Sequence, residues 1–279
     1  MTSIHPTAIV DRRVELGEDV KIGPYAILEG RVRVGAGCII EAHSVVRGPS
    51  RIGARCRIGP AAYVGLDPQH LKFNPNETES WLIVGDECVI REGVSVHRGS
   101  HDGIEHATRI GNRCFLMANS HAAHDAQIGD DVVMANAVLL GGHVTVGDRA
   151  FLGGGAGVHQ FCRIGRLAVV AGNEPVARDI PPFAAARYGG IKGYNAVGCR
   201  RAGISTTNIH AIREAFYCLH TYRTIPAAVE AIRDRGLAKV PEVRELLEFI
   251  ATSKRGIQPS VRFLAGMHTH VPSADSVVD

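Results

Sequence analysis

The chain has 279 residues, 45% of them hydrophobic, and a formal net charge of +3. This charge is too small to indicate a nucleic-acid-binding protein, and without a run of 18 apolar residues we expect no membrane span. Seven cysteines without a CxxC pair argue against a disulfide framework and a thiolate zinc site. The N-terminus lacks a signal-peptide pattern, so we expect a cytoplasmic protein.

An aliphatic residue followed by glycine recurs at multiples of six residues through most of the chain. The pairs are Leu16-Gly17, Ile22-Gly23, Val34-Gly35, Ile52-Gly53, Ile58-Gly59, Val64-Gly65, Val84-Gly85, Ile110-Gly111, Ile128-Gly129, Leu140-Gly141, Val146-Gly147, Leu152-Gly153 and Ile164-Gly165. A fixed short period predicts a β-solenoid in which three hexapeptides make one coil of 18 residues. We expect the aliphatic residue to point inward and the glycine to supply the backbone angles of a tight corner.

Two breaks in the phase predict loops that leave the solenoid. The steps from Val64 to Val84 and from Val96 to Ile110 are each two residues longer than a multiple of six. Segments 66–83 and 98–108 are therefore expected to be loop insertions, and loops on a rigid scaffold commonly carry function.

The repeat ends after Val176, where the breaker Asp179-Ile180-Pro181-Pro182 follows. The first domain is therefore predicted to cover residues 1–183. Amphipathic patterns predict three helices, over 205–222, 226–235 and 241–253, within a C-terminal helical domain of residues 184–256. Residues 257–279 lack a clear pattern and are expected to form a flexible tail.

Four histidines fall on neighbouring coils. The inward positions 122, 140 and 158 are 18 residues apart and stack along one corner of the prism, which brings together His121, His124, His143 and His159. Gly142 is predicted to lie one strand spacing from His124. An exposed histidine can act as a general base on a hydroxyl, and a glycine N–H beside it can stabilise an oxyanion. Asp125 either orients the ring of His124 or points away.

Two other interpretations of this cluster stay open. Three neutral imidazoles and a water molecule can bind zinc, as in hexapeptide-repeat trimers that resemble γ-class carbonic anhydrases. Alternatively, the histidines are structural and are satisfied by neighbours on the stacked edge, in a scaffold without catalysis.

Several motifs, in order from about residue 4 to 255, resemble the UDP-N-acetylglucosamine O-acyltransferase family of lipid A biosynthesis. They are HPTAIV, KIGPYAI, REGVSVHRGS, NSHAAHDAQIGDDVVMANAVLLGGHVTVGD, GVHQFCRIG, VARDIPPF and GYNAVGCRRAGIS. The resemblance implies a mainly β fold, a left-handed parallel β-helix of hexapeptide repeats with a C-terminal α-helical domain, assembled as a homotrimer. It also implies transfer of a 3-hydroxyacyl chain from acyl carrier protein to the 3-hydroxyl of UDP-N-acetylglucosamine.

The resemblance assigns roles to residues of this chain. His124 would be the general base, Asp125 its support and the Gly142 amide the oxyanion donor, and Gly172 matches the position that limits acyl length. Substrates would be bound by Gln69, His70, Lys72, His121, His143, His159, Gln160, Asn195 and Arg201. No metal and no cofactor are expected, because the phosphopantetheine thioester of acyl carrier protein is the donor substrate.

Three positions depart from the family pattern. His70 stands where an acid is usual, Val197 where a glutamate is common, and Tyr188 replaces a polar residue. These changes fall on sugar contacts, so N-acylation of a 3-amino UDP-sugar by the same site is an alternative. A second alternative is the N-acyltransferase of the same pathway, which normally carries an extra N-terminal domain that we do not expect in this protein.

Overall fold

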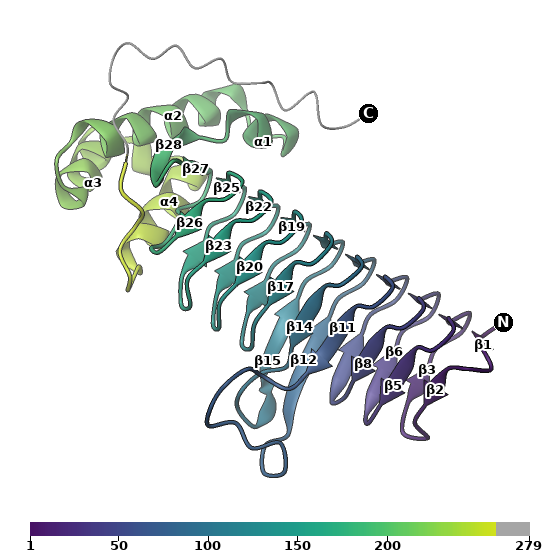
Figure 1. Ribbon diagram of the computed structural model, residues 1–279. Coiled ribbons are helices and arrows are strands. Elements are labelled where there is room, and N and C mark those ends of the chain that lie inside the picture. Colours follow the sequence, from purple (N-terminus) through teal and green to yellow (C-terminus); the bar gives the residue numbers. More distant parts are fainter. Residues whose placement is uncertain (261–279) are drawn as a thin grey trace.

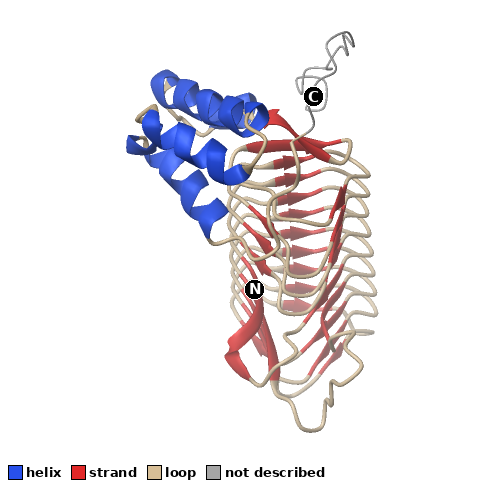
Figure 2. Cartoon of the chain, turned by 90° about the vertical axis from the view of Figure 1, so that its left-hand side faces the viewer, coloured by secondary structure: helices blue, strands red, loops and turns tan. Residues whose placement is uncertain are grey.

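The computed structural model describes residues 1–260 and shows a three-sided prism of short strands with helices at one end (Figure 1). Three sheets run along the prism, parallel except for the last strand pair of the first sheet, and are linked mostly by tight turns (Figure 2). The fold class predicted from the repeat, a parallel β-helix followed by helices, is confirmed.

The strands of each sheet follow one another along the prism. The first sheet contains β1 (Ser3–Ile4), β4 (Lys21–Ile22), β7 (Ile39–Ile40), β10 (Arg57–Ile58), β13 (Val89–Ile90), β16 (Phe115–Leu116), β19 (Val133–Met134), β22 (Phe151–Leu152), β25 (Val169–Val170), β27 (Ala184–Arg187) and β28 (Gly190–Tyr194). The second contains β2 (Ile9–Val10), β5 (Ile27–Glu29), β8 (Val45–Arg47), β11 (Tyr63–Leu66), β14 (Ser95–His97), β17 (His121–Ala122), β20 (Leu139–Leu140), β23 (Gly157–Val158) and β26 (Pro175–Val176). The third contains β3 (Glu15–Leu16), β6 (Val32–Val34), β9 (Ser50–Ile52), β12 (Ser80–Val84), β15 (Gly103–Ile110), β18 (Gln127–Ile128), β21 (Thr145–Val146) and β24 (Arg163–Ile164).

Inward-facing aliphatic residues form a continuous column inside the prism. In the second sheet, Ala122 pairs in register with Leu140, and Leu140 pairs with Val158, as the 18-residue period predicts. All three side chains are buried. Each strand is too short to be stable alone, so the coils stabilise one another through shared apolar contacts and backbone hydrogen bonds.

Of the glycines in the repeated pairs, only Gly65 has the positive φ that was predicted (80°), so at the other pairs the predicted cause was wrong. Gly17, Gly35 and Gly53 are absent from the residues with positive φ, which occur two positions later, at Asp19, Gly37 and Arg55. A Cβ atom on Gly35 would lie 2.6 Å from the backbone nitrogen of Ala54 in the next coil. The repeat therefore uses glycine because neighbouring coils approach closely there.

The two predicted loops are shorter than expected. Strand β11 continues to Leu66 and β12 begins at Ser80, so the first loop covers 67–79 instead of 66–83. Segment 98–108 is mostly strand, because β15 begins at Gly103 and pairs with the lengthened β12. A register shift between these two strands absorbs the extra residues.

The C-terminal part begins with strands instead of helices. Strand β27 adds to the first sheet in parallel with β25 and turns back into β28, so the prism continues beyond the predicted boundary at 183. Helix α1 (Ala196–Arg201) follows, and η1 (Leu237–Lys239) precedes the last helix. The three predicted helices are present as α2 (Thr206–Thr221), α3 (Ile225–Asp234) and α4 (Pro241–Ala251).

The chain returns to the prism after α4. The N–H of Gln258 donates to the Asp179 carbonyl (2.8 Å), and the Ile191 N–H donates to the Pro259 carbonyl (2.8 Å). Residues 257–260 are thus attached, contrary to a tail starting at 257, and the remainder of that predicted tail, 261–279, lies outside the described residues. Within residues 1–260, no helix has the length and apolar character needed to cross a bilayer.

Replacing one core residue should weaken the whole prism. Leu116→Ala removes a fully buried side chain and should lower the free energy of unfolding by about 2–5 kcal/mol through lost burial and a cavity. Urea unfolding followed by circular dichroism, at one protein concentration, measures this as a lower midpoint. The control Lys21→Ala, at an exposed strand position, should leave the midpoint almost unchanged; equal effects of both substitutions would contradict a shared core.

Candidate active site

Six of the predicted site residues lie in the turns after three consecutive strands of the second sheet, at its corner with the third: His124, Asp125, Gly142, His143, His159 and Gln160. Each of these turns contains one residue with positive φ, at Asp125 (61°), His143 (59°) and Phe161 (64°). A backbone hydrogen bond from the His143 N–H to the His124 carbonyl (3.0 Å) joins the first two turns. The coil period thereby stacks side chains that are distant in the sequence.

His124 and Asp125 form a hydrogen-bonded pair. Nδ1 of His124 lies 2.6 Å from Oδ2 of Asp125, and the two side chains are 12% and 9% exposed. Burial raises the pKa of Asp125, but hydrogen bonds to His124 and Ser100 outweigh burial and hold this pKa at about 2. The carboxylate therefore stays charged at neutral pH, and its contact with Nδ1 leaves Nε2 as the free nitrogen of His124.

Asp125 is fixed by two residues that the sequence alone did not identify. Both the N–H and the hydroxyl of Ser100 donate to its carboxylate, at 3.0 and 2.6 Å. The Asp125 N–H donates to the hydroxyl of Thr108 at 2.8 Å. Ser100 lies within the segment predicted as a functional loop, but no sequence spacing revealed which residue of the segment would face Asp125.

His143 packs on the same carboxylate from the next coil. Its Nε2 lies 3.4 Å from Oδ2 of Asp125, and its ring stands perpendicular to that of His124, at 5.3 Å between centroids. Phe161, another residue not selected from the sequence, stacks face to face on His143 at 4.5 Å. Burial lowers the pKa of His143, although the charge of Asp125 acts in the opposite direction.

Gly142 lies against the imidazole of His124. A Cβ atom at this position would be 2.7 Å from Cε1 of His124 and 2.9 Å from its Nε2, so a larger residue would displace the ring. The Gly142 carbonyl accepts from the Phe161 N–H at 2.9 Å, whereas its own N–H has no partner among residues 1–260. A free backbone donor therefore lies beside the imidazole.

His121 forms part of the floor of the site. Its Nδ1 is 2.7 Å from the Ser95 hydroxyl, and its ring packs edge-on against buried His97 at 5.0 Å. Burial lowers the pKa of His121. It lowers the pKa of His97 to about 4, and the neighbouring His121 and His124 act in the same direction. Both rings are thus uncharged near neutral pH.

A groove of about 630 Å³ runs across the second sheet in front of His124. Its wall contains predicted residues from the first loop and from three coils. They are Gln69, His121, His124, Gly142, His159 and Gln160. The floor continues along the outward-facing residues Leu139, Gly157 and Pro175 of neighbouring strands, which suits an acyl chain. His70 stands beside the groove with its ring perpendicular to His124 at 5.5 Å.

Asp125, His70 and His143 contact His124 without lining this groove. Four further predicted residues do not line it within one chain. Lys72 is exposed on the first loop, and Arg201 is exposed at the end of α1. The side chain of Asn195 caps α1 by accepting from the Gly198 N–H (2.8 Å) and donates to the Leu167 carbonyl (2.8 Å). Gly172 lies against Gly154 of the preceding coil, because a Cβ there would be 3.2 Å from the Gly154 carbonyl oxygen.

The three imidazoles considered for a zinc site are not brought together within one chain. Among residues 1–260, the only group of three or more potential ligands that is close enough to hold a metal ion contains His124, Asp125 and His143. His121 and His159 are outside this group; Nδ1 of His121 faces Ser95, and Nδ1 of His159 faces the Gln160 carbonyl (3.1 Å).

Acidification should destabilise the fold through the buried histidines. A folded-state pKa of about 4 for His97, against about 6.5 when unfolded, means that only the unfolded chain binds this proton between those values. Stability should therefore fall by about 2 kcal/mol between pH 7.5 and pH 5 for His97 alone. Urea midpoints at the two pH values test this, and His97→Gln should reduce the difference. An unchanged difference in the variant would contradict the assignment.

Family models match both parts of the chain. The model described as bacterial transferase hexapeptide (six repeats) matches residues 13–48 and 107–142. The model described as UDP N-acetylglucosamine O-acyltransferase, domain 2, matches residues 179–258. The first model thus matches two parts of the prism, and the second matches most of the C-terminal part.

Named relatives and solved structures are similar over most of their lengths. Acyl-[acyl-carrier-protein]--UDP-N-acetylglucosamine O-acyltransferase from Janthinobacterium sp. is 43% identical, with 92% of this chain and 99% of the relative covered. The enzyme of that name from Sinorhizobium fredii is 39% identical, with 89% and 92% covered. The structure of UDP-N-acetylglucosamine acyltransferase from Francisella novicida has a TM-score of 0.86 at 30% identity, with 96% and 100% covered. The chain therefore belongs to the UDP-N-acetylglucosamine O-acyltransferase family.

Proposed function

We propose that the protein transfers a 3-hydroxyacyl chain from acyl carrier protein to the 3-hydroxyl of UDP-N-acetylglucosamine, the first step of lipid A biosynthesis. The supporting observation is the arrangement of His124 between the Asp125 carboxylate and the Gly142 amide, at the wall of an apolar groove. The names of the relatives support the substrates.

In the proposed reaction, Nε2 of His124 takes the proton of the sugar 3-hydroxyl while the oxygen attacks the thioester carbonyl. The ionised Asp125 holds the ring through Nδ1 and stabilises the imidazolium that forms. Collapse of the tetrahedral intermediate breaks the C–S bond, and His124 returns the proton to the departing thiolate. The products are the O-acyl sugar and the carrier-protein thiol, with no metal, cofactor or enzyme nucleophile required.

The Gly142 amide is proposed to donate to the oxyanion, and other coils support this role. At several coils of the third-sheet corner, the amide two residues after the buried aliphatic residue donates to a side-chain oxygen of the next coil. The Ala54 N–H donates to Asp86 (2.7 Å), and the Asn112 N–H donates to Asp130 (2.7 Å). Gly142 occupies the same position after Leu140, so its amide suits a negatively charged oxygen.

Assembly into a cytoplasmic homotrimer is part of the proposal. Outward-facing residues of the first sheet form an apolar column in register, from Val89 through Phe115 and Val133 to Phe151. Such a face suits contact with further copies of the chain. In the trimer, Lys72, Asn195 and Arg201 of a neighbouring copy would then make the substrate contacts that they do not make within one chain. Seven buried free cysteines are consistent with a reducing compartment.

The direct test is transfer from a panel of hydroxyacyl-carrier-protein thioesters to UDP-N-acetylglucosamine and to its 3-amino analogue, followed by mass spectrometry. Acylation of the parent sugar supports the proposal. Acylation of the amine alone would mean that His70 and Val197 belong to an acceptor site for a 3-amino sugar. A lack of product with both acceptors would reject acyl transfer.

Loss of the base should stop turnover without unfolding the protein. His124→Ala should lower kcat by about 10²–10⁴-fold, measured with the best donor from the panel. The exposed His5 provides the control, and His5→Ala should retain the wild-type rate. A His124→Ala enzyme with near-native kcat would remove the general-base role.

A methyl group on Gly142 should be nearly as harmful. Gly142→Ala places Cβ within 2.7 Å of the His124 ring, which displaces the base and blocks the oxyanion position, so kcat should fall by about 10²-fold or more. The matched control is Gly193→Ala, where a Cβ meets nothing within 4 Å. Native circular dichroism in both variants would show that the loss is local; full activity of Gly142→Ala would contradict the close contact.

A further inference from the structure

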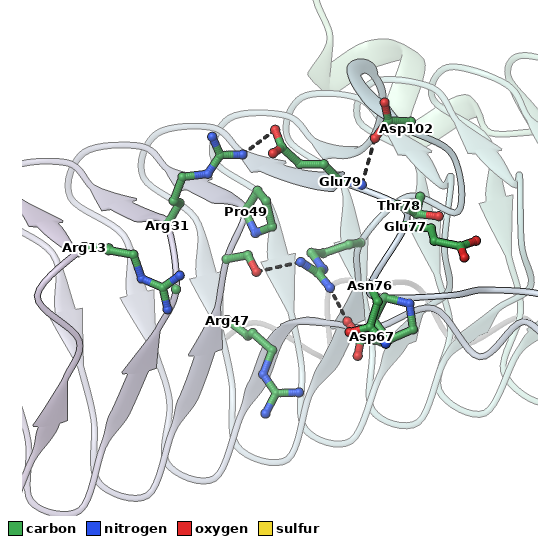
Figure 3. A pocket seen from close by; sticks show the side chains of 14 residues that line it. Arg13, Arg31, Arg47, Pro49, Asp67, Asn76, Glu77, Thr78, Glu79 and Asp102 are labelled. Atoms are coloured by element: carbon green, nitrogen blue, oxygen red, sulfur yellow. Dashed lines mark hydrogen bonds and ion pairs between the residues drawn. The ribbon is translucent and has the colours of Figure 1, made fainter.

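The first loop, residues 67–79, is fastened to the prism at its two ends (Figure 3). At its start, the Asp67 carboxylate accepts from the Arg98 guanidinium. At its end, Glu79 forms an ion pair with Arg31, and the Glu79 N–H donates to the Asp102 carboxylate (2.8 Å). Between these points, the side chain of Leu71 is fully exposed. The end contacts therefore determine where the loop lies.

Arg98 is a buried residue, unlike the other arginines around the loop. Its side chain is 7% exposed, whereas those of Arg31 and Arg47 are 50% and 41% exposed. Nη1 of Arg98 donates to the Gly48 carbonyl at 2.6 Å, and Nη2 donates to Asp67. Its Nε has no partner among the described residues. A buried guanidinium is costly unless it is paired, so the contact with Asp67 is strongly favoured.

The Arg98–Asp67 pair lies close in sequence to two groups on the loop that reach the site. Gln69, two residues after Asp67, lines the groove in front of His124. His70, the next residue, packs edge-on against the His124 ring. Arg98 itself does not line that groove. Its side chain therefore acts on the site only through the loop.

The turn that contains Arg98 also supports the base. Ser100, two residues after Arg98, donates twice to Asp125, which holds His124. The turn between β14 and β15 thus fixes the base on one side and the start of the loop on the other. A displacement of either part by about 1 Å is enough to slow a positioned reaction about 100-fold.

We propose that Arg98 is a positioning residue for the acceptor: by binding Asp67, it holds the start of the first loop so that Gln69 and His70 meet the UDP-sugar beside His124. This rests on the proposed function. The loop is then ordered before the sugar arrives, so binding the sugar does not have to supply the ordering entropy.

The test compares Asp67→Asn and Arg98→Lys with the wild-type enzyme under saturating and limiting concentrations of each substrate. KM for UDP-N-acetylglucosamine should rise about tenfold or more in both variants, while KM for the acyl carrier protein stays within about twofold of the wild type. Asp67→Asn preserves shape and removes charge at a partly exposed carboxylate, so this variant is expected to fold even if Arg98→Lys does not.

The matched control is Glu15→Gln, which breaks the exposed pair of Arg33 and Glu15 elsewhere on the prism. It should leave both KM values unchanged. Hydrogen exchange gives a second readout, in which amides of residues 67–73 should exchange faster in Asp67→Asn while those of 121–143 keep their protection. Trp81, the single tryptophan, packs between Arg31 and Arg51, and its unchanged emission would show that the other end of the loop stays in place.

Two results would overturn the proposal. An active wild-type enzyme with unchanged acceptor KM in Asp67→Asn and wild-type exchange in the loop would show that Arg98 does not position it. A parallel rise of both KM values with a lower unfolding midpoint would show a general structural role. If the wild-type enzyme transfers no acyl group, the proposed function fails instead, and the exchange experiment still tests whether Arg98 holds the loop.

Discussion

Hydrogen bonding between consecutive coils is the constraint on which the rest of the structure depends. Most strands contain only two or three residues, and the backbone groups of each are satisfied by the coil before and the coil after. An error of one residue in this register would turn inward side chains toward solvent along the whole sheet. The strict spacing of aliphatic residues along the chain follows from this requirement.

The same register explains why the site needs little dedicated architecture. His124, Gly142 and Phe161 come from three successive turns, and their separation is set by backbone bonds common to the entire prism. Only the Asp125 carboxylate requires support from outside the regular coils, which Ser100 provides. The scaffold fixes the distances between the site residues, and single side chains at its corner supply the reactive groups.

The sequence was sufficient for the fold and for the contact between His124 and Gly142, because both follow from a fixed period. It was insufficient where the chain departs from that period. The length of β15, the position of Ser100 and the Arg98–Asp67 pair depend on how the extra residues are accommodated between β12 and β15. The cause of the repeated glycines was also hidden, since the closeness of neighbouring coils is a tertiary property. Lys72, Asn195 and Arg201 do not line the groove within one chain, and the sequence motifs contain no information on this.

The hydrogen bonds that corner amides donate to the next coil have a consequence for how such a site can arise. At several coils of the third-sheet corner, a side chain of the next coil accepts a hydrogen bond from the amide, as Asp130 does from Asn112. At Gly142, the following coil carries Gln160 instead of an acid, and no described side chain accepts from the amide. A backbone donor of this kind therefore needs no dedicated residue: every coil already contains the polar group, and it is available to a substrate wherever the next coil offers no acceptor.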